Sequence, residues 1–152
     1  AMMYAVDQDI GRVVAHLQSR NLLDNTLILI SSDNGGLRSV RHPEVLLKGG
    51  KATLYEGGLA VPLVAHWPAR ISPASTNTSM IMTHDLMPTL LDLCGMDTTE
   101  LETLIDGRTK ASAFTTDILM PHEPVIWELA GSPRRSTDIR ADRYLAFQNG
   151  PY

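Results

Sequence analysis

The hydrophobic pattern of the chain predicts first a helix and then a buried strand. Residues 2–20 place apolar side chains at spacings of three and four, with polar residues between them, which is typical of an amphipathic helix. Residues 26–30 form a continuous run of β-branched and aliphatic residues, Thr-Leu-Ile-Leu-Ile. Such a run predicts a strand that is covered on both faces in a parallel α/β sheet. We expect the helix to pack on that sheet, because only residues 21–25 connect the two.

Later segments predict a second strand, a second helix and a small antiparallel sheet. The second strand is expected over residues 61–67, since one proline opens this segment and another closes it. A helix capped by Thr83 or Asp85 should run to about Cys94, and the glycine after it should end it. Short strands in an antiparallel arrangement are then expected over Val125–Leu129, Ile139–Arg140 and Tyr144–Phe147.

The fold class is therefore α/β, with sheet strands flanked by helices and followed by a small antiparallel sheet. We expect the core to occupy residues 1–110 and a partial antiparallel subdomain to occupy residues 111–152. A parallel sheet needs further strands, but this chain opens with a helix and offers only one other strong candidate. We therefore expect the chain to be part of a longer protein.

Composition narrows the class of protein. The chain has 152 residues, of which 43% are hydrophobic and 20% charged, which is ordinary for a globular domain. Its net charge of -4 argues against a nucleic-acid partner, and no apolar run approaches the roughly 20 residues needed to cross a membrane. The single cysteine, Cys94, excludes an internal disulfide and is expected to be a buried small hydrophobe. None of these features determines the localisation.

The aliphatic run ends in two oxygen-bearing side chains, Asp33 and Asn34, followed by two glycines. Ligand sites in open α/β sheets lie beyond the carboxyl ends of the strands. Carboxylate and amide oxygens suit calcium or magnesium and do not suit zinc. Two ligands are too few for a complete site, and the same four residues are also a common turn sequence. The segment therefore predicts either part of a metal site or a plain turn.

A lysine in a glycine-rich turn is the second candidate for chemistry. Lys51 follows Gly49 and Gly50, but Val45 and Ala52 stand where a Walker A loop needs glycine and serine or threonine. Lys51 is therefore either an anion-binding point charge or a solvated surface lysine.

Other titratable residues near these segments leave their roles open. Glu56 is either structural or a support for neighbouring ligands. His42 and His84 lie in loops, where each either donates to a bound anion or is structural.

Together the two candidate segments resemble a known family. Residues 24–36, Asp-Asn-Thr-Leu-Ile-Leu-Ile-Ser-Ser-Asp-Asn-Gly-Gly, and residues 47–62, Leu-Lys-Gly-Gly-Lys-Ala-Thr-Leu-Tyr-Glu-Gly-Gly-Leu-Ala-Val-Pro, are similar to the C-terminal half of type I sulfatases. These are arylsulfatase-like enzymes with an alkaline-phosphatase-like fold. Residues 84–95 resemble the family's following helix, and residues 139–144 resemble strands of its small C-terminal sheet.

The resemblance implies a sulfate ester hydrolase. By this likeness, Asp33 and Asn34 hold a divalent cation, usually calcium and alternatively magnesium, together with carboxylates from the family's N-terminal half. Lys51 contacts the sulfate group of the substrate. Preorganised positive charge of this kind stabilises charge that develops on the transferred group.

One departure from the family pattern limits what this chain does alone. The family's formylglycine nucleophile arises in a Cys/Ser-x-Pro-x-Arg segment, which does not occur in this sequence. We expect an inactive segment of a longer sulfatase that binds the cation weakly or not at all and self-associates through exposed apolar surface. The alternatives are a non-catalytic binding or assembly domain and a phosphoester or phosphonate hydrolase of the same superfamily. Family members are often periplasmic, secreted or lysosomal.

Overall fold

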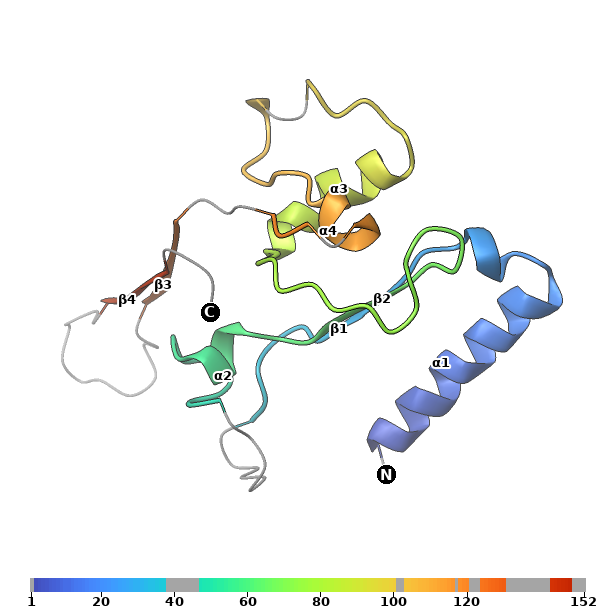
Figure 1. Ribbon diagram of the computed structural model, residues 1–152. Coiled ribbons are helices and arrows are strands. Elements are labelled where there is room, and N and C mark those ends of the chain that lie inside the picture. Colours follow the sequence, from blue (N-terminus) through green and yellow to red (C-terminus); the bar gives the residue numbers. More distant parts are fainter. Residues whose placement is uncertain are drawn as a thin grey trace. The chain divides into compact units, whose positions relative to one another are not determined.

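A computed structural model describes residues 2–37, 47–100, 103–116, 118–120, 124–130 and 143–148 (Figure 1). By their contacts the residues divide into two compact units, one of residues 1–29 with 65–121 and one of residues 30–64 with 122–152. The predicted boundary after residue 110, between the α/β core and the small antiparallel subdomain, is a boundary within a larger fold. It stays a prediction. The elements in chain order are α1 (Met2–Ser19), η1 (Leu23–Asn25), β1 (Ile28–Ser31), α2 (Glu56–Leu59), β2 (Leu63–His66), η2 (Thr83–Asp85), α3 (Leu86–Leu93), α4 (Ala111–Thr115), β3 (Val125–Ala130) and β4 (Arg143–Gln148).

Helix α1 confirms the predicted amphipathic helix and ends at a left-handed residue. Asn21 has a φ of 56°, a conformation that asparagine tolerates better than most residues. Its N–H donates to the carbonyl of Gln18 at 3.0 Å, and the N–H of Leu22 donates to that of Leu17 at 3.0 Å. These two bonds satisfy carbonyl groups that the last helical turn leaves without an intrahelical partner.

The apolar stripe of α1 is only half-buried in the described structure. Ile10, Val14 and Leu17 share this stripe, and no residue of the helix is buried. The expectation that this helix packs on the sheet stays a prediction. Met2 and Met3 are 85% and 80% exposed. Self-association through such apolar side chains stays a prediction.

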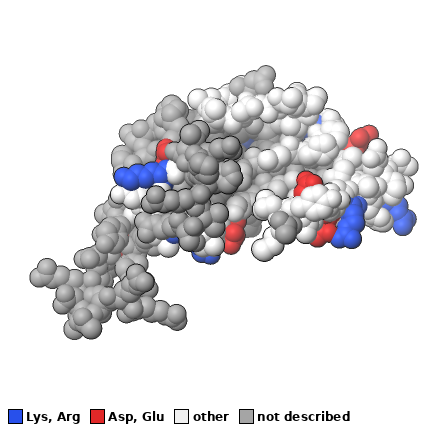
Figure 2. All heavy atoms as spheres, turned by 90° about the horizontal axis from the view of Figure 1, so that it is seen from below, with Lys and Arg blue, Asp and Glu red and all other residues white. Residues whose placement is uncertain are grey.

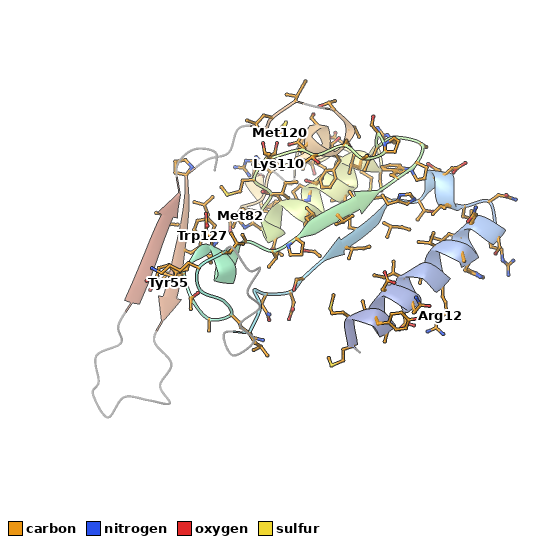
Figure 3. The ribbon with its side chains drawn as sticks, turned by 60° about the horizontal axis from the view of Figure 1, so that its bottom comes forward. Arg12, Tyr55, Met82, Lys110, Met120 and Trp127 are labelled. Atoms are coloured by element: carbon orange, nitrogen blue, oxygen red, sulfur yellow. The ribbon has the colours of Figure 1, made fainter. Side chains whose placement is uncertain are left out.

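Strands β1 and β2 pair with each other. Contacts at both ends of the pair show that they run in opposite directions, so the expected parallel arrangement is wrong for this pair. The carbonyl of Asp24, before β1, accepts the N–H of Ala69, after β2, at 3.0 Å. At the other end, the Ser31 hydroxyl donates to the carbonyl of Pro62, which precedes β2, at 2.9 Å. Figure 3 shows the two arrows pointing opposite ways.

The aliphatic run in β1 is also less covered than its pattern predicts. Ile28 and Leu29 are half-buried, and Ile30 is 36% exposed. An aliphatic run reports that a strand favours burial, but it carries no information on strand direction or on which segment supplies the cover.

The buried Asp85 organises the entry to α3 and confirms the predicted helix start. Its side chain accepts the N–H of Met82 at 2.9 Å through Oδ2 and the N–H of Arg108 at 2.9 Å through Oδ1. Asp85 is only 5% exposed. The backbone of Gly107 approaches so closely that an added Cβ would lie 2.6 Å from the carbonyl carbon of His84. One carboxylate thus ties the start of α3 to a segment more than twenty residues further along the chain.

Helix α3 ends at Gly95, as predicted, with a φ of +77°. Arg70, four residues beyond β2, donates from Nη1 to the carbonyl of Leu93 at 2.8 Å, and its guanidinium lies 4.8 Å from the ring centroid of the buried Trp67. A cation at this end of a helix satisfies a terminal carbonyl and opposes the negative end of the helix dipole. Cys94 is exposed, so its expected burial is wrong.

Helix α4 lies beside α3 and was not predicted from the sequence (Figure 1). It has five residues, too few for a helical period to be recognised. The hydroxyl of Thr89 on α3, 1% exposed, accepts the N–H of Lys110 at 2.8 Å. Because Lys110 immediately precedes α4, this bond fixes where the helix begins against α3.

In the second unit, β3 and β4 pair antiparallel, in register from Val125 opposite Gln148 to Ala130 opposite Arg143. This confirms two of the predicted short strands. The third, over residues 139–140, lies outside the described residues. Among the helices that the structure describes, none has the length and apolar content needed to span a membrane.

Candidate functional site

The bend that follows β1 carries both predicted metal ligands. Asp33 is exposed and Asn34 is half-buried. The Ser32 hydroxyl donates to the carbonyl of Asn34 at 2.9 Å, and the Asn34 side-chain nitrogen donates to the carbonyl of Gly35 at 2.9 Å. The side-chain amide oxygen of Asn34 takes no part in either bond. The bend therefore presents one carboxylate and one amide oxygen, the donor types that a hard cation takes.

The donor set fits calcium or magnesium in kind but not in number. Calcium takes six to eight oxygen ligands, and magnesium takes six. Within the described ranges, no three His, Cys, Asp or Glu side chains gather closely enough to hold a metal ion. Asp33 and Asn34 would thus hold such an ion only together with ligands from elsewhere.

Lys51 lies on a tight turn built by glycine and threonine. Gly49 has a φ of +90° and Ala52 a φ of 64°. The Thr53 hydroxyl donates to the carbonyl of Gly50 at 2.7 Å and accepts the N–H of Gly50 at 3.2 Å. This local hydrogen bonding holds the turn and leaves the side chain of Lys51 exposed.

A backbone hydrogen bond brings the two predicted segments together. The N–H of Lys51 donates to the carbonyl of Gly36 at 2.8 Å. Gly36 lies two residues after Asn34, so the cation-type ligands and the lysine occupy adjoining loops of the second unit. Such an arrangement can present positive charge on both sides of a bound anion.

The short helix α2 follows these loops and packs against both. The N–H of Gly57 donates to the carbonyl of Lys48 at 2.8 Å. Gly35 is buried, and a Cβ added to it would lie 2.8 Å from the Cα of Gly58 and 2.9 Å from the carbonyl carbon of Gly57. Glu56 is exposed in the first turn of α2.

A second lysine on the same turn is held by an aromatic ring. The ammonium of Lys48 lies 4.1 Å from the centroid of the Tyr55 ring, which is 48% exposed. Tyr55 immediately precedes α2 (Figure 3). A cation over a ring face is attracted by about 0.5–1 kcal/mol at exposed sites. Sequence reasoning missed this pair, although the spacing of Lys48, Lys51 and Tyr55 in a glycine-rich loop was the available signal.

Positive charge is not gathered into a broad patch on the face shown in Figure 2. Lys and Arg side chains alternate there with Asp, Glu and uncharged residues among the described parts of the chain.

Two histidines were further candidates from the sequence. His84 lies in η2, with Nε2 3.8 Å from the buried carboxylate of Asp85. Its role, structural or anion-binding, stays a prediction. His42 lies outside the described residues.

Comparison with known proteins identifies the family. The sulfatase family model matches residues 1–96. A sulfatase from Formosa agariphila is 36% identical over 104 residues, which are 62% of this chain and 19% of that protein. The steryl-sulfatase of Rattus norvegicus is 33% identical over 111 residues, 68% of this chain and 19% of that protein. A crystal structure of Ps i-CgsB in complex with k-i-k-neocarrahexaose is 35% identical, with a TM-score of 0.74 over 84% of this chain and 28% of that one.

These matches define an α/β protein with an alkaline-phosphatase-like fold, in agreement with the predicted fold class. The chain belongs to the sulfatase family. It spans about a fifth of the length of the curated relatives it matches.

Proposed function

We propose that this chain is the part of a sulfate ester hydrolase that supplies half of a divalent-cation site and a sulfate-binding lysine. Asp33 and Asn34 are the cation ligands, and Lys51 is the group that contacts the sulfate. The observation that carries the proposal is the hydrogen bond from the Lys51 N–H to the Gly36 carbonyl, at 2.8 Å, because it joins the two loops. Membership of the sulfatase family supports it.

The chemistry of the residues supports these roles. A bound calcium or magnesium ion would polarise a sulfate oxygen and offset charge that develops on it. The exposed ammonium of Lys51 is a compact point charge that binds a neighbouring sulfate oxygen. The hydrogen bond from Asn34 to Gly35 uses the amide nitrogen and leaves the amide oxygen free of that bond. The bound cation and Lys51 would thus both attract negative charge on the ester, and neither forms a covalent bond with it.

The reacting nucleophile must come from residues outside this chain. No Cys/Ser-x-Pro-x-Arg segment occurs in the 152 residues. We expect the isolated chain to show no turnover of a chromogenic aryl sulfate. Turnover by the isolated chain at the rate of a complete enzyme would contradict the proposed division of labour.

The role of Lys51 is tested in the complete polypeptide that carries this chain. Lys51→Ala should lower kcat/KM for an aryl sulfate by about 100-fold or more, the scale found when a preorganised electrostatic contact is removed. Lys51→Arg keeps the charge and should recover part of the loss. The control is Arg20→Ala, which removes an exposed cation from the first unit and should leave kcat/KM unchanged. Unchanged turnover in Lys51→Ala would argue against a sulfate contact.

The choice between sulfate and phosphate esters is tested on the same polypeptide. We expect kcat/KM to be higher for an aryl sulfate than for the matching aryl phosphate. A preference for the phosphate would favour a phosphoester hydrolase of the same superfamily. Absence of turnover on either ester would favour a binding or assembly domain.

A further inference from the structure

Two glycine-bearing segments of the second unit meet at the buried residue Gly35, namely its own loop and the helix α2. Gly35 directly follows the proposed ligand Asn34, and the carbonyl of the next residue accepts the N–H of Lys51. A Cβ on Gly35 would lie 2.8 Å from the Cα of Gly58, 2.9 Å from the carbonyl carbon of Gly57, and closer still to the carbonyl oxygen of Gly57. All three neighbours are backbone atoms, which cannot rotate away as a side chain does.

Helix α2 is held in this position from its other side as well. The N–H of Gly57 donates to the carbonyl of Lys48 at 2.8 Å. A Cβ on Gly58 would lie 2.5 Å from the carbonyl oxygen of Gly50 and 2.8 Å from the hydroxyl oxygen of Thr53. The first turn of α2 therefore packs against both the loop that bears Asn34 and the turn that bears Lys51, the lysine turn.

We infer that Gly35 is a positioning residue. It lets the loop that bears Asp33 and Asn34, the ligand loop, touch the backbone of α2. In this way it sets the separation between these two cation ligands and the sulfate-binding Lys51. This inference rests on the proposed function and deepens it. Any side chain at Gly35 must push the ligand loop away from α2, and α2 is tied to the lysine turn. A displacement of about 1 Å is enough to cost on the order of 100-fold in a preorganised site.

Gly36 supplies a matched control for this inference. A Cβ added to Gly36 meets nothing within 4 Å, and its backbone does not adopt a positive φ. Gly35→Ala and Gly36→Ala therefore make the same chemical change at adjacent residues of one loop, and only the first meets the backbone of α2. Gly57→Ala is an intermediate case, because its Cβ would lie 2.9 Å from the Lys48 carbonyl oxygen.

The experiment measures the coupling between cation and anion binding in the complete polypeptide that carries this chain, because Asp33 and Asn34 by themselves supply too few ligands to hold the cation. Calcium chloride and methyl sulfate, a soluble sulfate monoester, are titrated separately and together at constant ionic strength, with binding followed by amide chemical shifts in NMR spectra. In the complete unmodified polypeptide and in its Gly36→Ala variant, saturating calcium should lower the Kd for methyl sulfate by at least about fivefold, the lower end of typical coupling between sites. In Gly35→Ala each ligand should still bind alone, within about twofold of the unmodified polypeptide, while calcium no longer changes the methyl sulfate Kd.

Amide hydrogen exchange gives a second readout that does not depend on ligands. The Lys51 amide should be protected in the unmodified chain and in Gly36→Ala, partly protected in Gly57→Ala and unprotected in Gly35→Ala. A purely structural role for Gly35 would instead weaken the binding of each ligand alone and lower protection throughout the unit. That result would overturn the inference.

The remaining outcomes separate this inference from the proposed function. If the complete unmodified polypeptide binds neither calcium nor methyl sulfate, the proposed function is wrong and the inference falls with it. If it binds both without coupling, or if the coupling survives Gly35→Ala, only the positioning role is wrong. Equal losses in Gly35→Ala and Gly36→Ala would also overturn it. Should Gly35→Ala fail to fold, Gly57→Ala decides, and coupling there equal to that of the unmodified polypeptide would refute the inference.

Discussion

The carboxylate of Asp85 offers a sharp test of how the first unit is held together. Asp85 is 5% exposed and accepts two backbone N–H groups, one from Met82 and one from Arg108, each at 2.9 Å. Asp85→Asn keeps the size of the side chain but replaces one acceptor oxygen with an NH₂ group. One of the two N–H groups then faces a donor and loses its partner.

The expected cost follows from this geometry. A hydrogen bond to a charged acceptor contributes about 1.5–3 kcal/mol, and a buried donor left without a partner costs about 1–3 kcal/mol. Both figures refer to the loss of one and the same hydrogen bond, so they are not added. We therefore expect the free energy of unfolding to fall by about 2–3 kcal/mol in Asp85→Asn. Asp85→Ala removes both acceptors and should cost more than Asp85→Asn.

Urea denaturation followed by far-ultraviolet circular dichroism measures this change. With a slope near 2 kcal/mol/M, the midpoint should fall by roughly 1 M in Asp85→Asn. The control is Asp106→Asn, the same substitution at an exposed carboxylate two residues before Arg108. It should change the free energy of unfolding by less than about 0.5 kcal/mol. If Asp85→Asn is as mild as this control, Asp85 does not hold the two segments together.

Two further predictions concern single hydrogen-bonding and backbone features of the first unit. Thr89→Val keeps the shape of a side chain that is 1% exposed but removes the acceptor of the Lys110 N–H. It should lower the free energy of unfolding by about 1–3 kcal/mol in the same urea experiment, and a neutral result would contradict the role of this bond in placing α4. Asn21 has a φ of 56° at the end of α1, where glycine is unstrained and alanine is not. Thermal unfolding should therefore show Asn21→Ala to be less stable than Asn21→Gly by about 1 kcal/mol, and the reverse order would refute the assignment.

Much of the local structure was determined by the sequence alone. The spacing of apolar residues in 2–20 predicted α1, and the glycine after Cys94 predicted the end of α3. These features depend on residues within a few positions of one another. The candidate ligands Asp33 and Asn34 could be named for the same reason, because only Ser31 and Ser32 separate them from the aliphatic run.

Other predictions failed or were never made because they depend on segments far apart in the chain. The direction of β2 against β1 follows from contacts at both ends of the pair, Ala69 with Asp24 and Ser31 with Pro62, and the aliphatic run does not predict it. Cys94 has apolar neighbours in sequence, yet it lies exposed at the end of α3. Helix α4 is too short for a period, and its start depends on the contact between Thr89 and Lys110.

The candidate site shows the same division. The sequence by itself determined which side chains could hold a cation or a sulfate, since that depends on the chemistry of Asp33, Asn34 and Lys51. Only the tertiary structure decided that their loops adjoin, through the hydrogen bond from Lys51 to Gly36 and the close approach of Gly35 to α2. The physical reason is that a pattern of residue types reports local preferences, whereas the contact between two backbones depends on how distant segments pack.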